Sequence, residues 1–227
     1  MSLWALLIAW LVAIPPSAQA ETGATGEKAV PIAPPAANTS SLPRFADLVP
    51  GQHYIRIQNP SPIPGNKPQI SEVFNFKCPH CFHLHAVFEV WAEKNRGRFD
   101  IHSLPMAFEP QSDRPVRAYF TALFMGKGKE MKNLLFKANF VDSLDIENQD
   151  VIAFLAEEIG LKVDPFKEQM SSFGVVAKVS QAKAQAHAFG ITGTPSVVVN
   201  GRYLVHGSHT GGDWNRLLAI VETLSEH

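Results

Sequence analysis

The residues with the clearest chemical potential are Cys78 and Cys81, the two cysteines of this 227-residue chain, which are separated by Pro79 and His80. An apolar, strand-like segment precedes them, and a segment with helical periodicity follows. A thiol in the first turn of a helix lies beside unpaired backbone N–H groups and the positive end of the helix dipole, which favour the thiolate. Because the thiolate is the reactive form and the second thiol is one turn away, the motif predicts a dithiol that is oxidised and reduced reversibly.

The residues of this motif have separable roles. We expect Cys78 to be the nucleophile, because it comes first and should lie nearer to the solvent, and Cys81 to be the resolving thiol. Exchange would pass through a mixed disulfide with a substrate cysteine. His80 would stabilise negative charge on Cys78 as an imidazolium or an N–H donor, or it is an ordinary exposed helix residue. Lys77 adds nearby positive charge or is simply solvated, and Pro79 fixes φ at the start of the helix.

Glu72 lies on the apolar strand that leads into the motif, six residues before Cys78. An acidic side chain within such a strand is costly to bury unless it has a partner or a task. Either it points to solvent, or it lies beneath the dithiol, where it would accept protons from Cys81 and return them. We expect the second arrangement.

A second candidate segment, Gly193-Thr194-Pro195, comes just before a valine-rich run. An X-Pro bond is the common route to a cis peptide. A cis Pro195 beside the dithiol would expose the Thr194 backbone to an extended substrate peptide, which would pair with it like an added strand. On sequence alone, the same residues also fit an ordinary turn.

Two other uses of the cysteines can be weighed. A zinc site needs four ligands, and His83 and His85 would complete a set with the two thiols, but side chains two apart on a helix point about 200° apart. A structural disulfide at this spacing would close almost no loop and would therefore remove little unfolded-state entropy. We expect a redox pair, with no metal and no cofactor.

The first 44 residues differ from the rest. Residues 3–14 (LWALLIAWLVAI) form an unbroken apolar run, which Pro15-Pro16 ends and the small-x-small pattern Ala18-Gln19-Ala20 follows. Twelve helical residues rise only about 18 Å, short of the roughly 30 Å hydrocarbon core of a membrane. We therefore expect residues 1–20 to be a signal peptide cleaved after Ala20 rather than a retained anchor. We expect residues 21–44 to form a Pro/Ala-rich, disordered linker.

The remaining chain predicts an α/β pattern that a helical block interrupts. The expected strands are 53–57, 70–76, 99–104, 196–199 and 203–205. The expected helices are 79–96, 116–125, 129–138, 151–159, a short one from Asp164-Pro165 that ends at Gly174, 175–189 and 213–224. Asn200-Gly201 predicts a hairpin, since a type I′ turn needs positive φ at both residues. A net charge of −1 and the absence of a Lys/Arg run give no support for nucleic-acid binding.

Taken together, these segments resemble the DsbA family of periplasmic disulfide oxidases. Residues 76–81 (FKCPHC) are similar to its active site, and residues 69–74 (QISEVF) to its incoming strand, with Glu72 at the position of its buried acid. Residues 193–203 are similar to its cis-proline loop and hairpin. The resemblance covers residue 45 to the C-terminus. It implies a thioredoxin-like α/β fold, formed by residues 45–110 and 179–227, with an inserted all-helical domain over residues 111–178.

The resemblance also implies a function. The protein would be a protein disulfide oxidoreductase that introduces disulfide bonds into reduced, unfolded exported proteins in the periplasm. A DsbB-like, quinone-linked membrane oxidase would reoxidise it, and it would act as a monomer.

One residue leaves alternatives open. The best-known members carry Val before the cis proline, whereas this chain has Thr194, a residue that occurs at this place in disulfide isomerases and in some oxidases. An isomerase or a thiol reductase on the same fold therefore remains an alternative. The isomerases have a dimerisation domain where this chain has its linker, which favours an oxidase. A peptide-binding chaperone with an idle dithiol is a third possibility.

Overall fold

The computed structural model describes residues 42–60 and 65–227. The expected signal peptide and residues 21–41 of the expected linker lie outside the described residues. The last part of that linker belongs to the fold. Thr223 donates a hydrogen bond to the Pro43 carbonyl oxygen at 2.8 Å, and Arg44 forms an ion pair with Asp47 at 2.9 Å.

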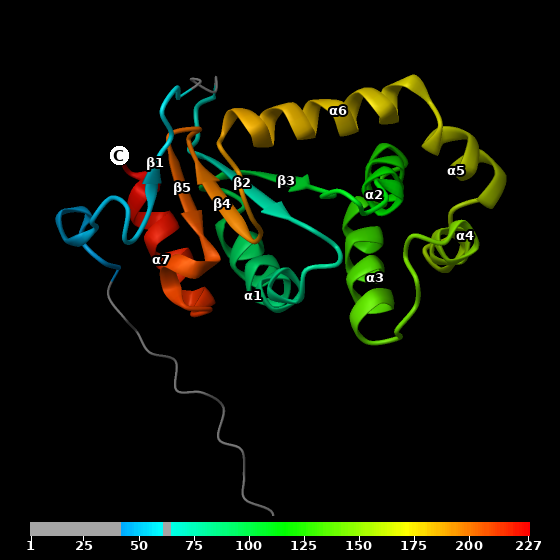
Figure 1. Ribbon diagram of the computed structural model, residues 1–227, viewed down its shortest axis with the longest axis horizontal. Helices are drawn as coiled ribbons and strands as arrows, with labels where there is room; N and C mark the ends of the chain where they lie inside the picture. The colour runs from blue at the N-terminus through cyan, green and yellow to red at the C-terminus, as the bar shows by residue number, and fades with distance from the viewer. Residues whose placement is uncertain (1–41, 61–64) are drawn as a thin grey trace, which may run out of the picture. The chain divides into compact units, whose positions relative to one another are not determined.

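A mixed sheet lies at the centre of the described chain (Figure 1). Its strands, in spatial order, are β1 (Ile55–Arg56), β5 (Tyr203–His206), β4 (Ser196–Val199), β2 (Gln69–Phe74) and β3 (Asp100–Pro105). The neighbours β2 and β3 are parallel, and the other neighbouring pairs are antiparallel. The parallel pair is connected through α1 (Pro79–Asn95), so the dithiol motif lies at the strand-to-helix step of a βαβ unit.

Six further α-helices follow β3. They are α2 (Arg114–Phe124), α3 (Gly128–Phe140), α4 (Gln149–Glu158), α5 (Val163–Met170), α6 (Phe173–Ala188) and α7 (Trp214–Ser225). Helices α2 to α5 form the block at one end of the sheet, and the long α6 carries the chain back to β4 (Figure 1). Within the described residues, no helix is both long and apolar enough to cross a membrane.

The two faces of the sheet belong to different clusters of buried side chains. Val197 and Val199 of β4 pack in one cluster with α1 and α7, whereas Val198 between them packs in the other, with residues of α2 to α6. This alternation confirms the expected valine-rich strand. The order of the strands and the helical block after β3 give the thioredoxin-like α/β fold with a helical insertion that the family resemblance implies.

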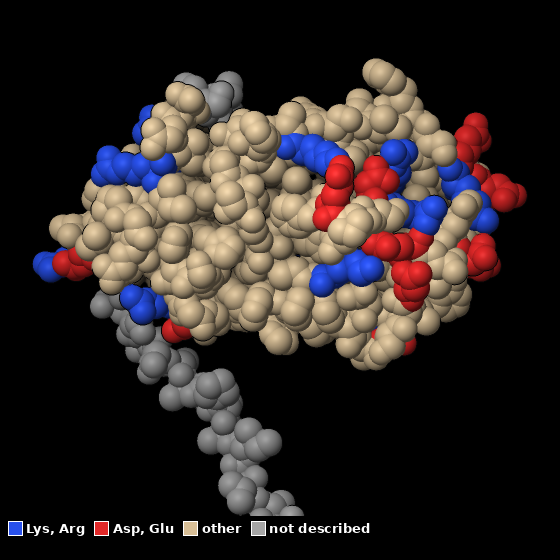
Figure 2. All heavy atoms as spheres, viewed as in Figure 1, with Lys and Arg blue, Asp and Glu red and all other residues tan. Residues whose placement is uncertain are grey.

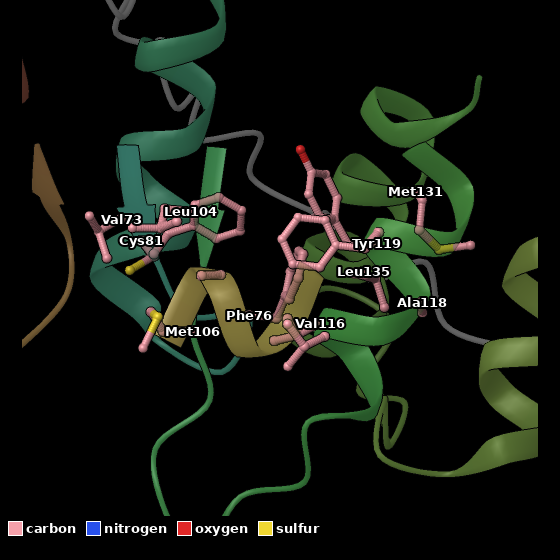
Figure 3. Packing of buried hydrophobic residues seen from close by; sticks show 14 of the residues in the cluster. Val73, Phe76, Cys81, Leu104, Met106, Val116, Ala118, Tyr119, Met131 and Leu135 are labelled. Carbon is pink, nitrogen blue, oxygen red and sulfur yellow. The ribbon is translucent and has the colours of Figure 1, made fainter. Parts of the chain in front are cut away.

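The helical block also packs against the segment that carries the dithiol. The ring of Phe76, two residues before Cys78, lies 5.1 Å from Phe136 of α3 and 6.2 Å from Tyr119 of α2, centroid to centroid. Figure 3 shows Phe76 and Tyr119 between α3 and the dithiol region, where Cys81 lies beside Val73 and Leu104. Burying these rings fixes the loop before the motif.

Most expected elements are present, but several bounds differ: β1 covers only residues 55–56 of the expected 53–57, and β2 ends at residue 74 rather than 76. The hairpin turn has the expected positive φ at Asn200 (53°) and Gly201 (63°). Gly174, in contrast, does not end α5. That helix ends at Met170, and Gly174 lies in the first turn of α6, because the Ser172 side chain caps the new helix by accepting the Val175 N–H at 3.3 Å. Helix α6 also runs across the expected 178/179 division.

Candidate active site

The dithiol lies at the N-terminus of α1. Cys78 is the N-cap residue, Pro79 occupies the first turn, and the Cys78 sulfur accepts the Cys81 backbone N–H at 3.4 Å. Cys78 is partly exposed, whereas Cys81 is 1% exposed and faces the core. Both are free thiols here, so the structure describes the reduced site. One sulfur is thus open to a substrate, and the other is not.

The Gly193-Thr194-Pro195 segment faces this dithiol from across the fold. The Thr194–Pro195 bond is cis. The Cys78 sulfur lies 3.4 Å from the Thr194 carbonyl oxygen, to which it donates when it is protonated, although the two residues are 116 positions apart. The pairing of Val73 in β2 with Ser196 in β4 brings them together. The sequence-based expectation of a cis proline beside the dithiol is therefore confirmed.

The two sulfurs differ strongly in acidity. Hydrogen bonding with the Cys81 thiol, assisted by the backbone N–H groups of Cys81 and His80 and by the Thr194 side chain, lowers the pKa of Cys78 to about 5 against the opposing effect of burial. Burial, together with the hydrogen bond to Cys78, raises the pKa of Cys81. At neutral pH the reduced site therefore holds a Cys78 thiolate beside a protonated Cys81.

His80 is exposed at the rim of the site. Its ring lies 6.3 Å from the ring of Trp214, the first residue of α7, and its backbone N–H is among the groups that lower the pKa of Cys78. Gly207 lies between Trp214 and Pro195: a Cβ atom there would be 3.2 Å from both side chains. Sequence reasoning did not single out Trp214, because its proximity to the dithiol depends on the placement of α7.

Glu72 is buried, as expected, but its partner comes from the helical block. Its Oε2 accepts from the Lys132 Nζ of α3 at 2.6 Å, and the same ammonium lies 3.0 Å from Glu89 of α1. Burial raises the pKa of Glu72, although Lys132 opposes that shift. Lys132 lies 4.7 Å above the Phe74 ring.

The sequence does hold a signal for Lys132. It lies four residues before Phe136, so both belong to the buried face of one helix, and a buried cation needs an anion.

Polar contacts of Asn75 and Lys77 hold the loop before Cys78 in place. Asn75 donates to the Met106 carbonyl oxygen at 3.0 Å and accepts the Lys77 backbone N–H at 2.7 Å. The Lys77 ammonium lies 3.3 Å from Glu147, just before α4. The positive charge of Lys77 is thus neutralised locally rather than committed to the thiolate.

The histidines proposed as alternative zinc ligands have other surroundings. His85 is buried, its Nε2 lies 2.8 Å from the Asn133 side-chain oxygen, and burial lowers its pKa to about 4. His83 is exposed. Across residues 42–60 and 65–227, no group of three or more His, Cys, Asp and Glu side chains is disposed to hold a metal ion.

A dithiol at a helix N-terminus, facing a cis-proline loop across a βαβ–ββα sheet, defines the class of thioredoxin-like thiol:disulfide oxidoreductases. Within that class, the chain belongs to the DSBA-like thioredoxin domain family, whose sequence model matches residues 69–211.

Individual relatives agree with this assignment. The thiol:disulfide interchange protein DsbA of Azotobacter vinelandii is 28% identical over 174 residues, which are 76% of this chain and 81% of that protein. The crystal structure of Pseudomonas aeruginosa DsbA has a TM-score of 0.75 at 25% identity and covers 81% of this chain and 96% of its own. The oxidoreductase DsbA from Xylella fastidiosa has a TM-score of 0.72 at 29% identity, with coverages of 79% and 96%.

Proposed function

We propose that this protein introduces disulfide bonds into reduced, unfolded exported proteins, in the periplasm, with Cys78 as the sulfur that exchanges with substrate. The observation that supports this most is the contrast between the two thiols: Cys78 is accessible and has a pKa of about 5, whereas Cys81 is buried with a raised pKa. A stabilised thiolate favours the reduced enzyme, and an enzyme that is stable when reduced is a good oxidant.

The exchange has two steps. A substrate thiolate attacks Cys78 in the oxidised enzyme, the Cys78–Cys81 bond breaks, and Cys81 leaves and takes up a proton. A second substrate thiolate then attacks the substrate sulfur of the mixed disulfide, and Cys78 leaves as a thiolate. Because a thiol of low pKa is the better leaving group, the second step runs towards the substrate disulfide. We propose that buried Glu72 supports proton transfer at Cys81, and that Pro79 and the His80 N–H organise the helix start around Cys78.

Substrate would be held by backbone contacts. Thr194 and cis Pro195 lie beside Cys78, and an extended peptide pairing with the Thr194 backbone would place its cysteine at the sulfur. In Figure 2 most charged side chains gather over α2 to α5 and some lie at the end with β1 and α7, whereas the middle of this face carries almost none. A neutral surface with backbone pairing suits substrates of varied sequence.

The cellular setting is part of the same proposal. A DsbB-like, quinone-linked membrane oxidase would reoxidise the dithiol, and the protein would act as a monomer after removal of residues 1–20. Residues 45–110 and 179–227 would form the catalytic domain, and residues 111–178 the inserted one.

The test is oxidative folding of a reduced, unfolded protein that carries two cysteines. Wild-type protein should form the substrate disulfide, and Cys78→Ser should be inactive. In the presence of oxidised glutathione, Cys81→Ser should be trapped in a mixed disulfide through Cys78, which Cys78→Ser cannot form. Full oxidase activity of Cys78→Ser would refute the proposal.

The same protein variants distinguish an oxidase from an isomerase and from a chaperone. Rescue of a substrate with scrambled disulfides, faster than its formation from the reduced state, would indicate an isomerase. Peptide binding that a double Cys→Ser variant retains, without any thiol exchange by the wild type, would indicate a chaperone.

A further inference from the structure

A second imidazole lies on the cis-proline side of the dithiol. His206 ends β5 and pairs with Ser196, the residue after Pro195. Its Nε2 covers Gly193: a Cβ atom on that glycine would lie 2.9 Å from this nitrogen. Gly193 adjoins Thr194, whose carbonyl oxygen is 3.4 Å from the Cys78 sulfur. The ring therefore lies against the backbone that contacts the reactive thiol.

Ser208 gives this ring a partner in either protonation state. The Ser208 backbone N–H donates to His206 Nδ1 at 3.1 Å, which places the proton of the neutral ring on Nε2, towards Gly193. The Ser208 hydroxyl oxygen lies 2.7 Å from the same Nδ1. A protonated Nδ1 would donate to that oxygen, in exchange for the Ser208 backbone N–H that it accepts when the ring is neutral.

The pKa of His206 depends on its burial and on the charges around it. Burial lowers the pKa of His206, and negative charge on Cys78 works in the opposite direction. His209, whose ring lies 6.3 Å from that of His206, has its pKa lowered by burial and by positive charge on His206 and His53. The Cys78 thiolate is the group that favours a proton on His206, whereas a proton on His206 disfavours one on His209.

We propose that His206 takes up part of the proton that is set free when the Cys78–Cys81 disulfide is reduced, which makes it a redox-linked proton acceptor of the site. The idea rests on the proposed function, in which a substrate dithiol delivers two electrons and two protons. One proton remains on Cys81 and Cys78 stays a thiolate, so the second proton leaves the sulfurs. His206 binds a share of it at Nδ1, and the solvent receives the rest.

The direct test follows the imidazole C–H resonances by NMR against pH, in oxidised protein and in protein reduced with dithiothreitol. His206→Asn assigns the signal. His206 should titrate at higher pH in the reduced protein. Identical titration of His206 in both forms would overturn the proposal.

Two variants sharpen the result. Ser208→Ala removes the hydroxyl acceptor but keeps the backbone N–H, so His206 should titrate at lower pH than in the wild type. In His206→Asn, the equilibrium constant for reduction by glutathione should rise about tenfold per pH unit above the pKa of Cys78, because one whole proton is released. The wild type should show a shallower rise, and equal slopes would also overturn the proposal. None of these measurements requires oxidation of a protein substrate, so failure of the proposed function gives a different result.

Discussion

Replacing Thr194 with Val should weaken the oxidant. The Thr194 side chain is one of the groups that hold the pKa of Cys78 at about 5. A hydrogen bond to a charged group contributes about 1.5–3 kcal/mol. Because Cys78 is partly exposed and water replaces part of that interaction, we take about 1.4 kcal/mol, which corresponds to about one pH unit in the pKa of the thiol.

The same free energy affects the redox equilibrium. At pH 7 the Cys78 thiolate is the reduced form in both proteins, so its destabilisation by about 1.4 kcal/mol makes reduction about tenfold less favourable, or about 30 mV. The effect of Thr194 on Cys81 does not enter, since that thiol remains protonated at pH 7.

Thiolate absorbance at 240 nm, recorded against pH in the reduced protein, measures the shift. Ser196→Ala is the matched control, because its hydroxyl lies in the same loop but donates to the Gly193 carbonyl oxygen at 2.8 Å. We expect a higher midpoint for Thr194→Val and the wild-type midpoint for Ser196→Ala. An unchanged midpoint in Thr194→Val would refute the role given to this hydroxyl.

Three further changes test the electrostatics. The lowered pKa of Cys78 stabilises the reduced fold wherever the thiolate forms more readily in the folded than in the unfolded chain, and this stabilisation is lost as the pH falls through about 5. The difference in Tm between reduced and oxidised protein should therefore shrink between pH 7 and pH 4. A constant difference would contradict this. Lys132→Met leaves Glu72 buried without its cation and should lower the free energy of unfolding by about 3–5 kcal/mol, with partial recovery when Glu72→Gln is added; chemical denaturation measures both. Glu147→Gln breaks a partly exposed pair with Lys77 and should lose less than about 1 kcal/mol without moving the Cys78 midpoint at 240 nm, and a shifted midpoint would show that Lys77 acts on the thiolate.

Much of the fold could be predicted from local patterns in the sequence. The Asn200-Gly201 turn was predictable because few residues accept positive φ at two successive positions. The strand-to-helix step at Cys78 was predictable because an apolar run changes there to helical periodicity, with Pro79 in the first turn. The expectation that α5 ends at Gly174 was wrong. Ser172, two residues earlier, caps a new helix, and a glycine is tolerated in the first turn of that helix.

Contacts between segments that are far apart in the sequence could not be predicted from local patterns. Lys132 pairs with Glu72 across 60 positions, and no local pattern places α3 over β2. Trp214 lies near His80, and His206 lies against Gly193, because α7 and β5 fold back against the cis-proline loop. The redox pair was therefore predictable from the spacing of its two cysteines, whereas the groups around it required the tertiary structure.

The reduction potential of the Cys78–Cys81 pair, measured by equilibration with glutathione buffers, tests the central claim most directly. The stabilised Cys78 thiolate predicts a potential well above that of the glutathione couple, as expected for a protein that donates its disulfide. A potential near that of thioredoxin would mean that the pair is suited to reduce other proteins, and it would contradict the assignment as an oxidase.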